Sequence, residues 1–378
     1  MRVVHVNYDG AATGGASIAM LRIHHAMLTG GVESTIACAT LPDDEQAVLL
    51  PISLHCRVIQ FLSKCAMKLV SGRVVSTGLL PSGRIRKLSS LRTDAVVVHW
   101  LQCDTLSLRE ISRIKSTVFW FHHDLWPIRG VTAYEWFDVP LRLGWLDRLV
   151  QWNKHRVARR MGKRLIPVCA SQWVANEIRK SGMYTHDPVV IPLPLDAVFK
   201  PGVRHPGAKF RILNGARGGF EKGLKGGDRL LAALQLIPEN ERLDMEVVIF
   251  GGDGQDETQC GVSIHYIGRL QGEALAQAYR DADVFAFPSR QETFGQTKIE
   301  ALACGTPVVA FDETACAEGI RHKENGWIAA AGDIARYAEG IRYFYKAWKR
   351  GQTIRVSGDA EYSPESVAKK WIEVLKAR

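Results

Sequence analysis

Two glutamates, Glu292 and Glu300, stand eight positions apart around the start of an expected helix. The free backbone N–H groups and the dipole of a helix start favour a phosphate. Four residues supply those groups: Phe294, Gly295, Gln296 and Thr297. A carboxylate accepts hydrogen bonds from vicinal hydroxyls, so one glutamate can face a sugar and the other a ribose. The same spacing also arises between solvated helix-end charges, and that alternative stays open at this point.

The segments around these residues form a strand, a loop, a helix and a second strand. Residues 284–287 and 308–311 are short apolar runs, typical of buried strands. Residues 296–304 are predicted to be helical, and Gly305 stands where a helix end favours positive φ. The unit is therefore a βαβ piece of a parallel sheet.

A glycine-rich, basic segment precedes this unit in the chain. It spans residues 215–228, follows a predicted strand at 210–214 and leads into a predicted helix at 229–236. A flexible backbone with Arg and Lys side chains suits a diphosphate, although a solvated surface loop is the alternative. Its candidate cations, in order of preference, are Lys225, Arg217 and Lys222.

Two further candidates lie near the N-terminus. Gly14 and Gly15 follow a predicted strand at 2–7 and open a predicted helix, where they would let a ligand approach the backbone. The spacing is not that of a dinucleotide-binding G-x-G-x-x-G. His123 follows a predicted strand at 117–121, and the carboxyl end of a parallel strand is where α/β folds place ligands.

The stretch from Pro288 to Val309 resembles the donor-binding signature of the retaining glycosyltransferases of family 4. Gly-Gly-Ala-Ser-x-Ala at 14–19 and His123-Asp124 are similar to motifs of that family, in its exopolysaccharide or colanic-acid-type subgroup. The resemblance implies an α/β GT-B fold, in which two Rossmann-like domains have parallel sheets that face a central cleft.

The resemblance also implies roles for individual residues. His123 and Glu292 would face the transferred sugar, and Glu300 would bind the ribose. Lys225 and Arg217 would stabilise the β-phosphate, and the base would pack near Ile267. The chain departs from the family at 130–135 on the acceptor side and at 314–318, where a glycine pair is usual.

Length and the prolines near position 200 predict the domain organisation. The 378 residues suffice for two domains, and Pro192, Pro194, Pro201 and Pro206 mark a linker. We expect an acceptor-side domain at 1–195 and a nucleotide-sugar-binding domain at 196–358. Residues 359–378 are expected to form a helix that crosses back to the first domain.

Cysteine usage and hydropathy indicate the compartment. The eight cysteines form no C-x-x-C pair or zinc pattern, so a reducing cytoplasm is expected. There is no run of about 18 apolar residues that would span a membrane. Asp281 and Asp283 have the spacing of a metal-binding Asp-x-Asp but precede their strand, so they are interpreted as a solvated turn. We expect no metal and no cofactor.

The net charge of +10 comes largely from the first half of the chain. Residues 46–93 contain no acidic side chain, and residues 148–164 are rich in Arg and Lys. Nucleic-acid-binding patterns are absent, which leaves an anionic membrane surface or phosphorylated substrates as partners. One interpretation is that the protein binds peripherally to the inner face of the cell membrane. The alternative is that these basic residues form a solvated face with no membrane partner.

The resemblance implies a retaining hexosyltransferase, and the basic donor-side loop leads us to expect that it is metal-independent. The donor is a nucleotide sugar, and the acceptor is a glycan, expected to be lipid-linked, in bacterial surface polysaccharide or lipopolysaccharide assembly. Two alternatives remain. One is another GT-B enzyme, such as a nucleotide-sugar 2-epimerase or a phosphorylase, and the other is a non-enzymatic basic binding protein.

Overall fold

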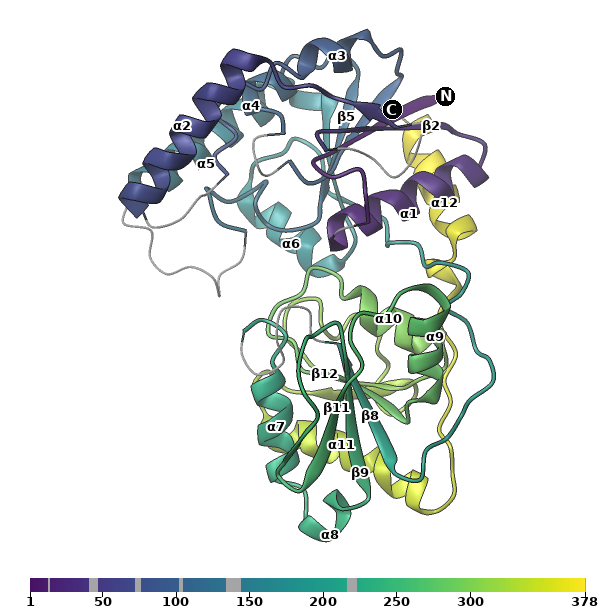
Figure 1. The fold of residues 1–378 in the computed structure, drawn as a ribbon. Helices are drawn as coiled ribbons and strands as arrows, with labels where there is room; N and C mark the ends of the chain where they lie inside the picture. Colours follow the sequence, from purple (N-terminus) through teal and green to yellow (C-terminus); the bar gives the residue numbers. More distant parts are fainter. Residues whose placement is uncertain are drawn as a thin grey trace. The chain divides into compact units, whose positions relative to one another are not determined.

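The computed structural model describes residues 1–12, 14–40, 47–71, 76–101, 105–133, 144–215 and 223–377. It divides into two compact units (Figure 1). The first comprises Met1–Pro194 together with the segment that starts at Glu361, and the second is Leu195–Ala360. Each unit has its own mainly parallel sheet covered by helices, which confirms the predicted α/β class.

The first unit is built on a seven-stranded parallel sheet with the order β3-β2-β1-β4-β5-β6-β7. Its strands are β1 (Arg2–Asn7), β2 (Glu33–Cys38), β3 (Val48–Leu49), β4 (Ala95–Val98), β5 (Thr117–His122), β6 (Leu165–Cys169) and β7 (Val189–Val190). Its helices are α1 (Gly15–Thr29), α2 (Leu54–Ser71), α3 (Ile85–Ser90), α4 (Leu108–Ile111), α5 (Gly144–Met161), α6 (Gln172–Ser181) and α12 (Pro364–Lys376). The central strands are largely apolar because helices cover both faces of the sheet.

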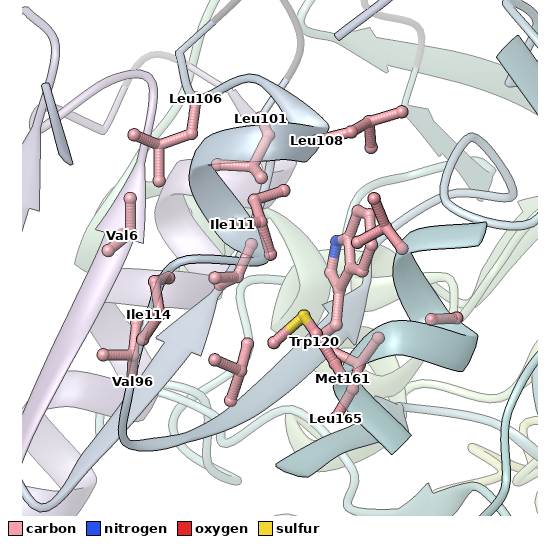
Figure 2. Packing of buried hydrophobic residues seen from close by; sticks show 14 of the residues in the cluster. Val6, Val96, Leu101, Leu106, Leu108, Ile111, Ile114, Trp120, Met161 and Leu165 are labelled. Atoms are coloured by element: carbon pink, nitrogen blue, oxygen red, sulfur yellow. The ribbon is translucent and has the colours of Figure 1, made fainter. Parts of the chain in front are cut away.

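One face of this sheet packs against α4 and α5. Figure 2 shows Trp120 of β5 among side chains from neighbouring strands and from these helices. The Trp120 side chain is fully buried. On the opposite face, α12 packs against α1, so the C-terminal helix completes the first unit (Figure 1). Trp371 of α12 contacts the rings of Phe119 and Phe121 on β5.

The second unit has a seven-stranded sheet with the order β10-β11-β9-β8-β12-β13-β14. Only the edge pair β10–β11 is antiparallel among the described strands. The strands are β8 (Phe210–Gly215), β9 (Met245–Phe250), β10 (Glu257–Gln259), β11 (Val262–Tyr266), β12 (Val284–Phe287), β13 (Val308–Phe311) and β14 (Gly326–Ala329). The helices are α7 (Gly227–Gln235), α8 (Glu239–Arg242), α9 (Gly272–Asp281), α10 (Gln296–Ala303) and α11 (Ile334–Lys349).

The predicted βαβ unit is confirmed, since β12 and β13 pair in parallel and α10 connects them. Gly305 has φ 88, as expected for a residue beyond a helix end. The expectation that Asp281 and Asp283 form a solvated turn is wrong. Asp283 forms an ion pair with Arg204 and accepts a hydrogen bond from the backbone N–H of Arg211 at 2.8 Å. Asp281 accepts a hydrogen bond from the backbone N–H of His205 at 2.7 Å. Both carboxylates precede β12 and bind residues of the linker.

The C-terminal helix is expected to contribute strongly to the stability of the first unit. Trp371 is fully buried, so Trp371→Ala should lower the free energy of unfolding of this unit by about 3–5 kcal/mol. Lys369→Ala on the exposed face of the same helix is the control and should change it by less than about 0.5 kcal/mol. Thermal unfolding monitored by tryptophan fluorescence provides the measurement. Equal midpoints for the two variants would contradict the packing role of α12.

Candidate functional site

The chain reverses its direction of strand addition between β8 and β12. From β8 the sheet grows through β9 to β11, and after α9 the chain returns to place β12 on the other side of β8. Ligands of open α/β sheets bind at the carboxyl ends of the strands at such a switch point. The segments that follow β8 and β12 are the two that carry the predicted phosphate and sugar residues.

Lys225 and Glu292 meet across this switch point. Lys225 Nζ lies 2.7 Å from Glu292 Oε1, with side-chain exposures of 39% and 13%. Burial disfavours the charged ammonium, but the ion pair and hydrogen bond with Glu292 outweigh burial and raise the pKa of Lys225. Lys225 is therefore charged at neutral pH. The structure thus brings together two predicted residues that are 67 positions apart.

Backbone and side-chain contacts join the loop that carries Lys225 to the loop that carries Glu292. The Arg290 N–H donates to Leu224 O at 2.8 Å, and its guanidinium donates to Gly223 O at 2.8 Å and binds Asp228. Gly226 has φ 68, and a Cβ there would lie 2.1 Å from the carbonyl oxygen of Pro288. The close approach requires glycine, so the relative position of Lys225 and Glu292 is set by the backbone.

The start of α10 has the geometry that the sequence predicts. Gly295 occupies the N-cap position with φ 81, and a Cβ there would lie 2.9 Å from the Phe287 ring. Phe294 is buried, whereas Gln296 and Thr297 are partly exposed. The first turn of the helix is thus held in place by an apolar anchor. It places the positive end of its dipole on the same loop as Glu292.

Glu300 lies one turn further along α10, and its side chain is turned toward α9. It is only 4% exposed, and Tyr279 Oη donates to Glu300 Oε2 at 3.2 Å. Its contact with a ribose stays a prediction. Tyr279, which sequence reasoning missed, orients this carboxylate. Its position in the apolar pattern of α9 gave no signal beyond that of a core residue.

A third loop, after β13, is bound to the Glu292 loop. The Glu292 N–H donates to Thr314 Oγ1 at 2.9 Å, and the Ala315 N–H donates to Glu292 O at 3.2 Å. The buried Lys298 of α10 donates to Ala315 O and, at 3.1 Å, to Cys316 O. Burial lowers the pKa of Lys298 to about 8. The segment that departs from the resembled family is therefore part of the support of Glu292.

Ile267 follows β11 and is 40% exposed. It lines a hollow of about 640 Å³ that runs along the sheet face beside α9, together with Leu213, Val248 and Leu270. A second hollow of about 450 Å³ lies beside Tyr266 and Gly268. The structure thus leaves open space near the strand end at which the sequence places a base.

The remaining described candidates belong to the first unit. Gly14 is the extended N-cap of α1, and its carbonyl accepts from the Ile18 N–H at 2.9 Å. Gly15 is exposed, and no atom lies within 4 Å of the position of a Cβ. His123 directly follows β5 and is half-buried, and burial lowers its pKa to about 3. Its imidazole is therefore neutral at pH 7.

Asp124, the neighbour of His123, shapes the turn after β5. Its carboxylate accepts from the Trp126 N–H at 2.9 Å. Lys154 of α5 is fully buried and donates to the carbonyls of Trp126, Arg129 and Gly130. Lys154 lies within the basic run at 148–164 but is not part of an exposed basic face, because its side chain is buried and donates to the carbonyls of a loop.

Arg217 and Lys222 lie outside the described residues. The described candidates form two groups, with Gly14, Gly15 and His123 in the first unit and the others in the second. In the described part of the chain, no three His, Cys, Asp or Glu side chains are placed to bind a metal ion together. None of the described helices is both long and apolar enough to cross a membrane.

Similarity to solved structures covers the whole chain. The structure of HepE from Anabaena in complex with UDP-glucose superposes with a TM-score of 0.68 at 14% identity and full coverage of both chains. Sucrose-phosphate synthase from Thermosynechococcus elongatus superposes with a TM-score of 0.64 at 16% identity, over 100% of this chain and 94% of that one. The chain has the GT-B fold, as predicted.

Similarity at the level of sequence covers part of the chain. Residues 200–357 match the family model of glycosyl transferases group 1. D-inositol 3-phosphate glycosyltransferase of Xylanimonas cellulosilytica is 43% identical over 98 residues, which cover 23% of each chain. The chain thus spans about a quarter of the length of this curated relative.

The close approach at Gly226 gives a direct test of the site's construction. Gly226→Ala should lower the unfolding midpoint more than Gly332→Ala, whose φ of 71 is nearly the same but whose Cβ would meet no atom within 4 Å. Gly332→Ala introduces only backbone strain, which costs about 1–3 kcal/mol. Any further loss in Gly226→Ala therefore measures the clash with Pro288 O. Differential scanning calorimetry of both variants is the measurement. Equal losses would mean that the two loops do not depend on this contact.

Proposed function

We propose that this protein is a glycosyltransferase that moves a sugar from a nucleotide-sugar donor to a glycan acceptor. The observation that carries the proposal is the Lys225–Glu292 pair at the switch point, beside the start of α10. The match of residues 200–357 to the glycosyl transferases group 1 model supports it. So does the fold shared with a protein whose structure contains UDP-glucose.

Departure of a nucleoside diphosphate develops negative charge on the β-phosphate. The Lys225 ammonium group and the N–H groups at Gln296 and Thr297 would stabilise that charge, because preorganised donors stabilise developing charge without reorganisation. Arg217 is assigned the same task on sequence grounds. Since cations do this work, the proposed reaction needs no metal ion.

Glu292 would accept hydrogen bonds from hydroxyls of the transferred sugar. Before the donor binds, Glu292 neutralises Lys225 at 2.7 Å, so no unpaired charge is left in a half-buried site. The diphosphate would replace Glu292 as a partner of Lys225, and the carboxylate would then turn to the sugar. Glu300, held by Tyr279, would bind the ribose hydroxyls, and the neutral His123 would bind the sugar or steady its positive charge in the transition state.

We further propose membership of the retaining family 4, with front-face displacement and a lipid-linked acceptor of bacterial surface polysaccharide assembly. The support for family 4 is the motif from Pro288 to Val309. The chain would work in the cytoplasm at an anionic membrane surface. An assay of sugar release with and without acceptor separates this reaction from 2-epimerisation, which requires no acceptor.

Exposed apolar side chains on two helices of the first unit support the membrane proposal. On α5, Trp145 and Trp152 are 64% and 52% exposed, and with Leu149 they follow the i, i+4, i+7 spacing of one helix face. Arg156 extends this face, with its guanidinium 5.6 Å from the Trp152 ring centre. On α2, the exposed apolar side chains include Leu54, Val58, Ile59, Phe61 and Leu62. Basic helices with exposed aromatic residues suit the headgroup region of anionic lipids.

The donor site is tested by two glutamate variants. Glu300→Gln should weaken binding of UDP or another nucleoside diphosphate, since a hydrogen bond to a charged group contributes about 1.5–3 kcal/mol. Glu292→Gln should instead lower kcat more than nucleotide affinity. Isothermal titration calorimetry and a transfer assay measure the two effects. Glu324→Gln, an exposed carboxylate of the same unit, is the control. Normal binding and turnover by both site variants would remove the assignment.

The membrane proposal is tested by co-sedimentation with vesicles. We expect binding to anionic phosphatidylglycerol vesicles that weakens as salt is raised. Because each basic side chain near such a surface contributes about 1 kcal/mol, the double variant Arg148→Glu, Arg156→Glu should reduce binding strongly. The matched control, Lys349→Glu with Arg350→Glu, reverses two exposed charges of the second unit. Equal binding to neutral vesicles would contradict an electrostatic contribution to membrane binding. The absence of binding to anionic vesicles would contradict the membrane proposal as a whole.

A further inference from the structure

Thr314 lies in the loop that follows β13 and has a backbone conformation that β-branched residues rarely adopt. Its φ is 51, which lies in the left-handed region. Among the described residues other than glycine, only Cys260 and Lys323 also have positive φ, and neither of them is β-branched. Such a conformation is strained and persists only where the surrounding structure imposes it. Strained residues of this kind gather at functional sites, so the neighbours of Thr314 indicate what it does.

Contacts on both sides of Thr314 impose its conformation. On one side, the Glu313 carboxylate lies 2.8 Å from Arg229 Nη1 of α7. On the other side, the buried ammonium group of Lys298 on α10 donates to the Ala315 carbonyl. The residues before and after Thr314 are therefore tied to two different helices, and Thr314 forms the turn between them.

The Thr314 hydroxyl takes part in a series of hydrogen bonds whose directions can be assigned. The Cys316 thiol donates its one hydrogen to Ser289 O at 3.4 Å. Burial raises the pKa of this thiol to about 12, so the thiol keeps its hydrogen at neutral pH. In the contact of 3.6 Å between Thr314 Oγ1 and Cys316 Sγ, the hydroxyl is therefore the donor. The hydroxyl oxygen in turn accepts from the Glu292 N–H at 2.9 Å.

Both polar backbone groups of Glu292 are thus bound by the loop after β13. The Glu292 N–H donates to Thr314 Oγ1, and the Glu292 carbonyl accepts from the Ala315 N–H at 3.2 Å. The Glu292 carboxylate is paired with Lys225 at 2.7 Å. In the proposed reaction the diphosphate takes the place of this carboxylate beside Lys225. The contacts with Thr314 and Ala315 then continue to fix Glu292 after its ion pair is broken.

We propose that Thr314 is a positioning residue that holds the backbone of Glu292, so that the carboxylate reaches the sugar once Lys225 binds the diphosphate. The role of Glu292 toward the sugar rests on the proposed function, whereas the anchoring of its N–H rests on the hydrogen bonds alone. Glycine adopts a positive φ without strain but offers no hydroxyl. The presence of a strained threonine is therefore explained by the acceptor that its side chain supplies to the Glu292 N–H.

The anchoring is tested first without an assay of activity. Thr314→Ser keeps the hydroxyl and Thr314→Ala removes it, and neither replacement is β-branched. Hydrogen exchange of the Glu292 amide, followed by NMR, measures the hydrogen bond. We expect exchange about tenfold faster in Thr314→Ala than in the wild type, since the loss of one hydrogen bond has an effect of that order. Thr314→Ser, and the control Thr353→Ala at an exposed hydroxyl of the same unit, should exchange at the wild-type rate.

Two results of the exchange experiment would overturn the anchoring. One is equal exchange at Glu292 in Thr314→Ala and the wild type. The other is exchange in Thr314→Ser that is as fast as in Thr314→Ala, because the hydroxyl would then not be the cause. If Thr314→Ala does not fold, Thr314→Gly takes its place, since glycine lacks the hydroxyl and tolerates this φ.

Kinetics then distinguish positioning from a general structural role. Thr314→Ala should lower kcat by roughly 10–100-fold, since misplacement of a group that contacts the substrate has an effect of this order. The Kd for UDP, measured by calorimetry, should not change, because Lys225 and the start of α10 are intact. Thr314→Ser should transfer sugar at nearly the wild-type rate. A parallel loss of UDP affinity and kcat in Thr314→Ala would indicate a merely structural role and overturn the proposal.

Failure of the proposed function would give a different result from failure of this inference. A wild type that transfers no sugar, but whose Glu292 amide is protected by the Thr314 hydroxyl, would reject the glycosyltransferase and leave Thr314 as the anchor of the loop. Transfer at equal rates by the wild type and Thr314→Ala would reject the positioning role and leave the glycosyltransferase in place.

Discussion

The ion pair between Lys225 and Glu292 is the interaction on which the candidate site in the second unit depends. Two oppositely charged groups reach a half-buried position from loops that follow different strands. Removing either partner would leave an unpaired charge in a half-buried position. The contacts at Gly226, Arg290 and Thr314 follow from this requirement, because they hold the backbone of both loops at the distance the pair needs.

The sequence predicted the framework of this site well, and the reason is physical. The strands at 284–287 and 308–311 were identified from apolar runs, and α10 from Gly295 at its start and Gly305 beyond its end. These signals are local, since they depend on burial and on backbone angles of adjacent residues. The pairing of Lys225 with Glu292 is not local, and the motifs named both residues without indicating that they touch. Nothing in the sequence indicates that Gly226 must be glycine, because the Pro288 carbonyl that excludes a Cβ there comes from a distant part of the chain.

Polar groups in the core were the least predictable part of both units. Asp281 and Asp283 were expected in solvent, but a distant arginine, Arg204, and backbone N–H groups bind them. The burial of His5, whose Nδ1 lies 2.9 Å from His99 Nε2, escaped prediction for the same reason. His5 reads as one polar residue in an apolar strand, and only the adjacency of β1, β4 and β5 explains why it is buried. Sequence periodicity reports which face a residue occupies but not which distant group satisfies it.

Two buried lysines show how each unit holds an irregular loop at a strand end. Lys154 donates to the carbonyls of the turn after β5, and Lys298 donates to those of the loop after β13. An ammonium group has three donors and no acceptor, so it can satisfy several carbonyls that have no partner in a sheet or helix. Both lysines lie on helices, where a lysine ordinarily indicates a solvated face. Burial lowers the pKa of each lysine. The hydrogen bonds of Lys154 hold the loop that carries Asp124, and those of Lys298 hold the loop that contacts Glu292. In each unit, a buried lysine therefore supports the loop that carries or contacts candidate site residues.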